Sequence, residues 1–134
     1  CPDLAQTVIA FCAALKIEIH CNGLQTLRIK ETDRIAALDN ELQKLGLASL
    51  TEIDSNNWLL KTCAQPLKGS DIVKSPLGDL GVSTYEDHRM AMAFAPLALK
   101  LNEIKIEEPN VVTKSYPMFW KDLEKSGFEI TATI

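Results

Sequence analysis

Charged residues crowd around the expected start of a helix in the segment "LRIKETDRIAALDNELQKLG", residues 27–46. Arg28, Lys30 and Arg34 stand around this start, interleaved with Glu31 and Asp33. A helix N-terminus carries unpaired N–H groups and partial positive charge, so cations there have the wrong sign for the helix dipole. Two interpretations follow: a solvated surface pair, i to i+4, or a site where cations and N–H groups together hold an anion.

The same placement of cations recurs at two later helices. His88 and Arg89 stand at the start of one expected helix, and Lys114 precedes another. Arginine suits two-pronged capture of a carboxylate or phosphate, whereas lysine acts as a point charge. Three repetitions favour a shared anion site over three unrelated surface pairs.

The nearby carboxylates could move protons, but the residues alone leave this open. Glu31 lies between Lys30 and Arg34, whose charges would lower its pKa, while burial would raise it. Asp3 can be explained as a helix N-cap, which is the simpler interpretation, and His88 as a packing histidine.

Apolar spacing predicts the elements that must position these residues. A first helix covers Asp3–Lys16, and a second has Ile35, Leu38, Leu42 and Leu45 on one face, with Gly46 after its end. Between them we expect extended segments at 17–20 and up to Lys30 around the turn Asn22-Gly23. A hairpin follows, with strands at 47–53 and 58–61.

The second half repeats this order. We expect a loop over 65–81 with a weak strand at 71–74, a helix over 87–100 with Pro96 inside it, and a strand at 103–107. A helix then opens at Ser115-Tyr116-Pro117 and ends at Gly127, before a strand at 128–133. Asp3 to Lys30 and Asp87 to Lys114 have equal spacing, so the pattern predicts two copies of one unit offset by 84 residues.

Composition places limits on the class of protein. The chain has 134 residues, 46% hydrophobic and 24% charged, which is typical of one globular domain or part of one. A net charge of -4 argues against a nucleic-acid-binding protein, and the longest apolar run, 90–99, is too short for a membrane span. Its four cysteines form no CxxC pair, which argues against structural zinc and favours free thiols in a reducing compartment. No signal-peptide pattern precedes the first helix, and the initial Cys1 suggests a piece of a longer protein.

Four segments resemble the signatures of one enzyme family, the 5-enolpyruvylshikimate-3-phosphate (EPSP) synthases. "RIKETDR" and the helix ending in "LQKLG" are similar to one signature, "TYEDHRMAMAFAPLAL" to a second and "TKSYPMFW" to a third. "PDLAQT" near the start resembles the family's aspartate-bearing helix start. The segments stand in the family's order and span nearly the whole chain.

The resemblance implies an α/β (α+β) fold of tandem βαβαββ units, with helices in the domain interior and sheets outside. The chain would be part of the C-terminal domain, with about 1–75 as one unit and about 76–134 as most of a second. The family transfers the enolpyruvyl group of phosphoenolpyruvate to the 5-hydroxyl of shikimate 3-phosphate, a cytoplasmic step of aromatic amino acid synthesis that glyphosate inhibits. No metal or organic cofactor is implied, nor any nucleic-acid or membrane partner.

Matching positions imply roles for individual residues. Asp3 would accept a proton near the shikimate hydroxyl, Glu31 would exchange a proton with the methylene carbon of phosphoenolpyruvate, and Lys30 would contact shikimate 3-phosphate and the developing charge. The remaining substrate-binding residues would be Thr26, Arg34, His88, Arg89 and Lys114. Arg34, Arg89 and Lys114 would bind phosphoenolpyruvate, and His88 would support Glu31. Thr26 departs from the Asn or His common in the family, which leaves its role open.

Two consequences and three alternatives accompany this interpretation. The family's other substrate contacts would lie in a missing N-terminal part, so the chain alone is expected to be inactive. The alternatives are the related enzyme that transfers enolpyruvate to a UDP-linked amino sugar, an RNA-end-processing relative, and a non-catalytic anion-binding scaffold. "KETDR" and "DHRMAM" favour the shikimate enzyme over the first, and net charge and few aromatic residues count against the second.

Overall fold

The fold is described from a computed structural model, which covers residues 4–29, 33–54, 56–62 and 81–132. The first half, which comprises the described residues up to Thr62, contains the helix α1 (Ala5–Ala14), the strand β1 (Ile19–Asn22), the 3-10 helix η2 (Gln25–Ile29), the helix α2 (Arg34–Lys44) and the strands β2 (Ala48–Asp54) and β3 (Asn57–Thr62). The second half, residues 81–132, contains the helix α4 (His88–Phe94), the 3-10 helix η3 (Ala95–Leu97), the helix α5 (Ala98–Leu101), the 3-10 helix η4 (Pro109–Val112) and the helix α6 (Phe119–Lys125). Helices with a three-stranded antiparallel sheet confirm the predicted mixed α/β class.

The helix α2 forms where the apolar spacing predicts it. Its N-cap is Asp33, whose Oδ1 accepts a hydrogen bond from the Ala36 N–H at 3.1 Å. Gly46 follows its end with φ +68°, a conformation that glycine adopts without strain. Leu38 and Leu42 are completely buried on the inner face, so the helix is anchored by the side chains that defined its period.

The sheet has the strand order β1-β3-β2, and both pairs are antiparallel. The predicted hairpin is therefore confirmed, with Leu50 opposite Leu60 and Cys21 opposite Trp58. Leu50, Trp58 and Leu60 alternate onto the buried face. This face packs on α1 and α2, which fixes the position of α2 in the molecule.

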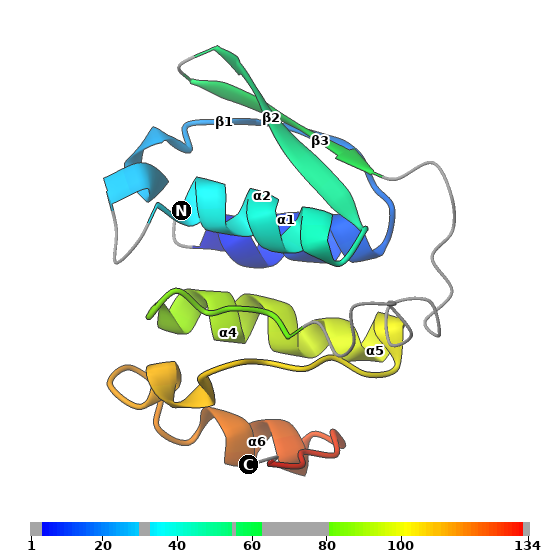
Figure 1. The fold of residues 1–134 in the computed structure, drawn as a ribbon, viewed down its shortest axis with the longest axis vertical. Coiled ribbons are helices and arrows are strands. Elements are labelled where there is room, and N and C mark those ends of the chain that lie inside the picture. Colours follow the sequence, from blue (N-terminus) through cyan, green and yellow to red (C-terminus); the bar gives the residue numbers. More distant parts are fainter. Residues whose placement is uncertain (1–3, 30–32, 55, 63–80, 133–134) are drawn as a thin grey trace.

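The elements are stacked in layers (Figure 1). The sheet covers the pair of helices α1 and α2. On the opposite side of this pair lie α4 and α5, and α6 is farthest from the sheet. Contacts of α4 with α1 and α2 join the two halves. The layering places the start of α4 beside the helices of the first half.

Three predicted extended segments differ from the structure. Residues 25–29 form η2 instead of continuing as a strand, because Leu24 and Leu27 are both buried and the Leu27 N–H donates to the Leu24 carbonyl at 2.9 Å. The segment 103–107 makes a single parallel bridge, Val82 with Ile106, so it is no regular strand. Residues 128–132 form no strand in the part of the chain described here, and the expected strand at 71–74 lies outside it.

The predicted helix over 87–100 is divided at its proline. Ala95–Leu97, which includes Pro96, is the 3-10 helix η3 between α4 and α5. Proline has no N–H and its ring crowds the preceding turn, which explains the change of helix type.

The helical elements of the second half follow those of the first at the predicted offset. Adding 84 to the positions of α1, η2 and α2 leads to α4, η4 and α6. Gln6 of α1 and Met90 of α4, which correspond at this offset, also contact each other, with Nε2 3.3 Å from Sδ. The division into units at about 75 stays a prediction.

Candidate functional site

A turn with unusual backbone geometry precedes α4. The Asp87 N–H donates to the Thr84 carbonyl at 2.8 Å, and the two residues between them, Tyr85 and Glu86, have φ of +55° and +56°. Positive φ costs non-glycine residues about 1–2 kcal/mol each, so the surrounding contacts must hold this turn in place. Its effect is to bring Asp87 to the start of α4.

The Asp87 carboxylate is completely buried and gathers donors from two helices. Its Oδ2 accepts from Arg34 Nε at 2.7 Å, and its Oδ1 accepts from Arg34 Nη2 at 3.2 Å. Oδ1 also accepts from the Arg89 N–H at 3.0 Å, which caps α4, and lies 3.9 Å from His88 Nδ1. One carboxylate therefore links Arg34 on α2 with His88 and Arg89 on α4.

A second buried carboxylate, Glu41, ties α2 to the same turn. Its Oε1 accepts from the Ser83 N–H at 2.7 Å and from Lys44 Nζ at 2.6 Å, and its Oε2 accepts from the Tyr85 hydroxyl at 2.9 Å. Burial, and then the adjacent Glu41, raise the pKa of Tyr85, so its hydroxyl keeps the proton it donates. The strained turn is thus fastened to α2 through Glu41 as well as through Asp87.

Three of the expected site residues are brought together by these contacts. The Arg34 guanidinium, the backbone N–H of Arg89 and, at 3.9 Å, His88 Nδ1 lie at the Asp87 carboxylate. Arg34 is 2% exposed, so the interpretation of Arg34 as a solvated surface residue is wrong. Thr26 is exposed on η2, and Lys114 is exposed just after η4. Asp3, Lys30 and Glu31 lie outside the described residues.

Arg28, from the same charged segment, belongs to a different environment. Its Nη2 donates to Glu52 Oε2 at 2.7 Å, and its guanidinium lies 5.4 Å from the ring centroid of Trp58. These are contacts with the sheet, so Arg28 braces η2 rather than contributing to the cluster at Asp87.

The sequence reasoning missed Asp87 and Glu41 as members of the site. Asp87 carried a usable signal, because it directly precedes His88-Arg89 at a helix start, where an acidic side chain both caps and pairs. Glu41 carried none, since one acidic residue in a charged helix resembles any solvated position.

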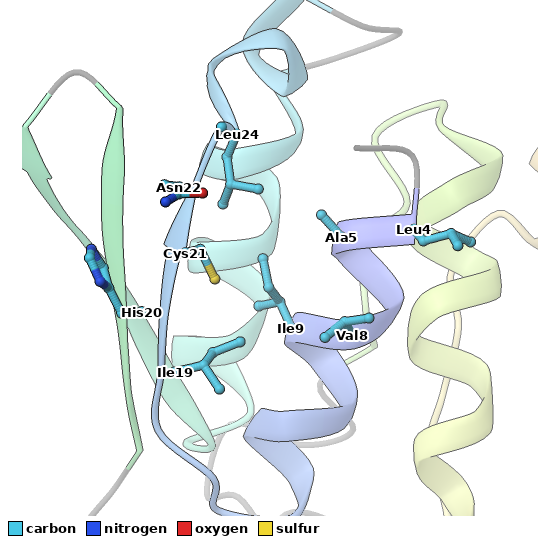
Figure 2. Close-up of a pocket in the computed structure, with 10 residues that line it drawn as sticks. Leu4, Ala5, Val8, Ile9, Ile19, His20, Cys21, Asn22 and Leu24 are labelled. Carbon is cyan, nitrogen blue, oxygen red and sulfur yellow. The ribbon is translucent and has the colours of Figure 1, made fainter. Parts of the chain in front are cut away.

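A groove of about 500 Å³ opens elsewhere, between α1 and β1. In Figure 2, Ile9 and Ala5 of α1 lie across from Ile19 and Cys21 of β1, whereas His20 points away from the helix. The groove is lined by Leu4, Ala5, Val8, Ile9, Ile19, His20, Cys21, Asn22, Gly23 and Leu24. None of the expected site residues in the described ranges is among them, and an apolar lining does not suit an anion.

The described residues give no metal site. Within the described ranges, no group of three His, Cys, Asp or Glu side chains is placed to hold an ion. Cys12 and Cys21 are half-buried free thiols, and burial raises the pKa of the Cys21 thiol. Among the same residues, no helix is both long enough and apolar enough to cross a membrane.

Comparison with known proteins gives a consistent result. Residues 1–123 match a family model described as EPSP synthase (3-phosphoshikimate 1-carboxyvinyltransferase). Two Bacteroides fragilis proteins named 3-phosphoshikimate 1-carboxyvinyltransferase are each 47% identical over 129 residues, covering 96% of this chain and 29% of theirs. A Methanospirillum hungatei protein of the same name is 37% identical over 125 residues, covering 93% of this chain and 26% of its own. The chain therefore spans less than a third of the length of these relatives.

Proposed function

The chain belongs to the EPSP synthase family, and from that membership we propose that the full-length protein carrying it is an enolpyruvyl transferase. It transfers the enolpyruvyl group of phosphoenolpyruvate to the 5-hydroxyl of shikimate 3-phosphate and releases phosphate. The hydroxyl adds to C2 of phosphoenolpyruvate while C3 gains a proton, and the tetrahedral adduct then loses that phosphate and a C3 proton. The cytoplasm is the expected location for the same reason of family membership.

The observation that carries the proposal is the pairing of the Arg34 guanidinium with Asp87, which caps α4 directly before His88 and Arg89. These residues come from "KETDR" and "DHRMAM", two signatures that the fold brings into contact although Arg34 and Asp87 are 53 residues apart in sequence. A carboxylate and a phosphate are the groups that arginine donors bind in pairs. Phosphoenolpyruvate carries both groups.

The proposed roles divide between binding and proton transfer. Arg34, Arg89 and Lys114 are assigned to phosphoenolpyruvate, His88 to the support of Glu31 and the pocket, and Thr26 to substrate binding on the shikimate side.

For the chemistry, Asp3 accepts the hydroxyl proton, Glu31 exchanges the proton at C3, and Lys30 contacts shikimate 3-phosphate and the developing charge. General acid-base groups of this kind contribute about 10²- to 10⁴-fold to a rate.

The site is proposed to need the rest of the protein. Thr26 and Lys114 are exposed, and the chain spans 29% of its relatives' length, so further substrate contacts are assigned to the remaining part. We expect no measurable transfer by the 134-residue chain alone.

The test is phosphate release by the full-length protein with phosphoenolpyruvate and shikimate 3-phosphate. We expect Glu31→Gln and Asp3→Ala each to lower kcat by about 10²-fold or more. Glu18→Gln is the matched control and should keep the full rate, because Glu18 is exposed in the loop between α1 and β1.

Two results would contradict the proposal. Unchanged rates in both variants would remove the assigned acid-base roles. Turnover with a UDP-linked amino sugar but none with shikimate 3-phosphate would assign the protein to the related transferase.

A further inference from the structure

We propose that Asp87 is a positioning residue that fixes the orientation of the Arg34 guanidinium for the anion it binds. The inference rests on the proposed function, because it assigns Asp87 a part in binding phosphoenolpyruvate through Arg34. Asp87 itself pairs with one edge of the guanidinium and is not placed in contact with substrate.

The geometry of the pair supports this role. Asp87 accepts from Nε and Nη2, which together form one edge of the planar guanidinium. An arginine has five N–H donors in a rigid plane, so an acceptor on this edge sets the direction of the donors on the remaining edges. An anion then meets donors whose positions are fixed before it arrives, which lowers the entropic cost of binding.

The burial of both partners makes the orientation durable. Arg34 is 2% exposed and Asp87 is completely buried, so water competes little for either group. Breaking such a pair leaves an uncompensated buried charge, whereas a surface pair exchanges readily with solvent. The guanidinium is therefore expected to stay on Asp87 in the absence of substrate.

Two attachments fix Asp87 relative to α2. Arg34 and Glu41 are seven residues apart on α2, about 10 Å along the axis, and each binds the segment that ends at Asp87. Positive φ at Tyr85 and Glu86 would disfavour this turn on its own, and the Glu41 contacts to Ser83 and Tyr85 hold it. The strain is thus located where it aims the carboxylate.

The contacts of Asp87 also distinguish positioning from simple stabilisation. The same Oδ1 that faces Arg34 Nη2 caps the Arg89 N–H and lies near His88. The carboxylate that pairs with Arg34 thus also caps the helix that carries Arg89 and lies 3.9 Å from His88 Nδ1. A pair needed only for stability would not have to lie at the start of α4.

The variant that tests this is Asp87→Asn in the full-length protein. Asparagine keeps the size and one oxygen for the Arg89 N–H, but its NH₂ would then face the Arg34 donors. We expect KM for phosphoenolpyruvate to rise about tenfold or more, with KM for shikimate 3-phosphate within about twofold of wild type. Asp33→Asn is the matched control, because it removes a negative charge beside Arg34 while asparagine remains a good N-cap for α2.

A double-mutant cycle identifies the route through Arg34. Arg34→Lys should raise KM for phosphoenolpyruvate, and adding Asp87→Asn should then have little further effect, because the guanidinium to be oriented is gone. Asp87→Glu should restore part of the affinity. Additive effects of the two substitutions, or an unchanged KM in Asp87→Asn, would overturn the proposal.

A readout without turnover separates this proposal from the proposed function. In ¹H–¹⁵N spectra we expect a slowly exchanging Arg34 Nε–H signal in wild type and in Asp33→Asn, and its loss in Asp87→Asn. A wild-type protein that shows this pattern but transfers no enolpyruvyl group would contradict the proposed function alone. A signal that survives Asp87→Asn would contradict the positioning role.

Discussion

Gln6 presents a polar group inside the core that the structure leaves partly unsatisfied. Gln6 is 1% exposed between α1 and α4, and its Nε2 donates to Met90 Sδ at 3.3 Å. Its Oε1 has no hydrogen-bond partner among the residues that the structure describes. A buried acceptor without a partner costs about 1–3 kcal/mol, and thioether sulfur is a weak acceptor for the amide. We predict that Gln6→Met stabilises the protein.

The size of the effect follows from these contacts. Methionine has a similar length and adapts to irregular space, so the substitution should create neither a large cavity nor a clash. Removing the orphaned acceptor gains about 1–3 kcal/mol and losing the weak N–H···S contact costs about 0.5 kcal/mol, for a net gain of about 1–2 kcal/mol. With about 2 cal/mol/K of unfolding entropy per residue, this raises Tm by roughly 4–7 °C.

Thermal and urea unfolding of the two proteins measure the change, with Trp58 fluorescence as the signal in a Trp120→Phe background. Gln43→Met, the same substitution at an exposed position of α2, is the control and should change stability by less than about 0.5 kcal/mol. A lower unfolding midpoint in Gln6→Met would show that Oε1 has a partner in the protein and would refute the reasoning.

Three further predictions concern the turn before α4. Glu86→Gly should raise the free energy of unfolding by up to about 1 kcal/mol in urea titrations, because Glu86 is exposed and glycine adopts positive φ without strain. A lower free energy of unfolding in this variant would contradict the positive φ at Glu86. Glu41→Ala should lower the free energy of unfolding by about 3 kcal/mol. The loss is smaller than for a fully buried ion pair because water can reach Lys44 once Glu41 is gone, and an unchanged urea midpoint would contradict the buried contacts of Glu41. The raised pKa of Tyr85 means that the folded protein holds a proton that the unfolded chain releases near its ordinary value of 10.0, so stability should fall as pH rises above that value. Tyr85→Phe should remove this part of the alkaline slope, as measured by urea midpoints from pH 8 to 11.

Local signals were sufficient to predict α2, which carries Arg34, and the hairpin of β2 and β3. The period of Ile35, Leu38 and Leu42 lies within one helix and Gly46 follows its end, and the hairpin of β2 and β3 is marked by alternation around a polar turn. These signals act over a few residues, so no knowledge of the remaining fold was required. Both elements are confirmed with ends shifted by a residue or two.

Where distant contacts decide the structure, the sequence could not predict it. The segment 25–29 has no strong local preference, and burial of Leu27 under the neighbouring helices selects a 3-10 helix over a strand. The environment of Arg34 depends on Asp87, 53 residues later, and that of Glu41 on Ser83 and Tyr85. Cation-rich helix starts predicted an anion site, but pairing partners at such separations are set by the packing of α2 against the turn before α4.

The pairing of Arg34 changes what this residue can contribute to an anion site. A guanidinium already neutralised by a buried carboxylate adds little net charge to attract an anion from a distance. It offers donors with fixed direction, which act at contact. In the proposed site, the cations at helix starts would therefore have two functions: Lys114, exposed beyond η4, would supply charge, and Arg34, held by Asp87, would supply orientation. Lys114→Gln should accordingly weaken the ionic-strength dependence of phosphoenolpyruvate binding in the full-length protein, whereas Asp87→Asn should weaken binding at every ionic strength.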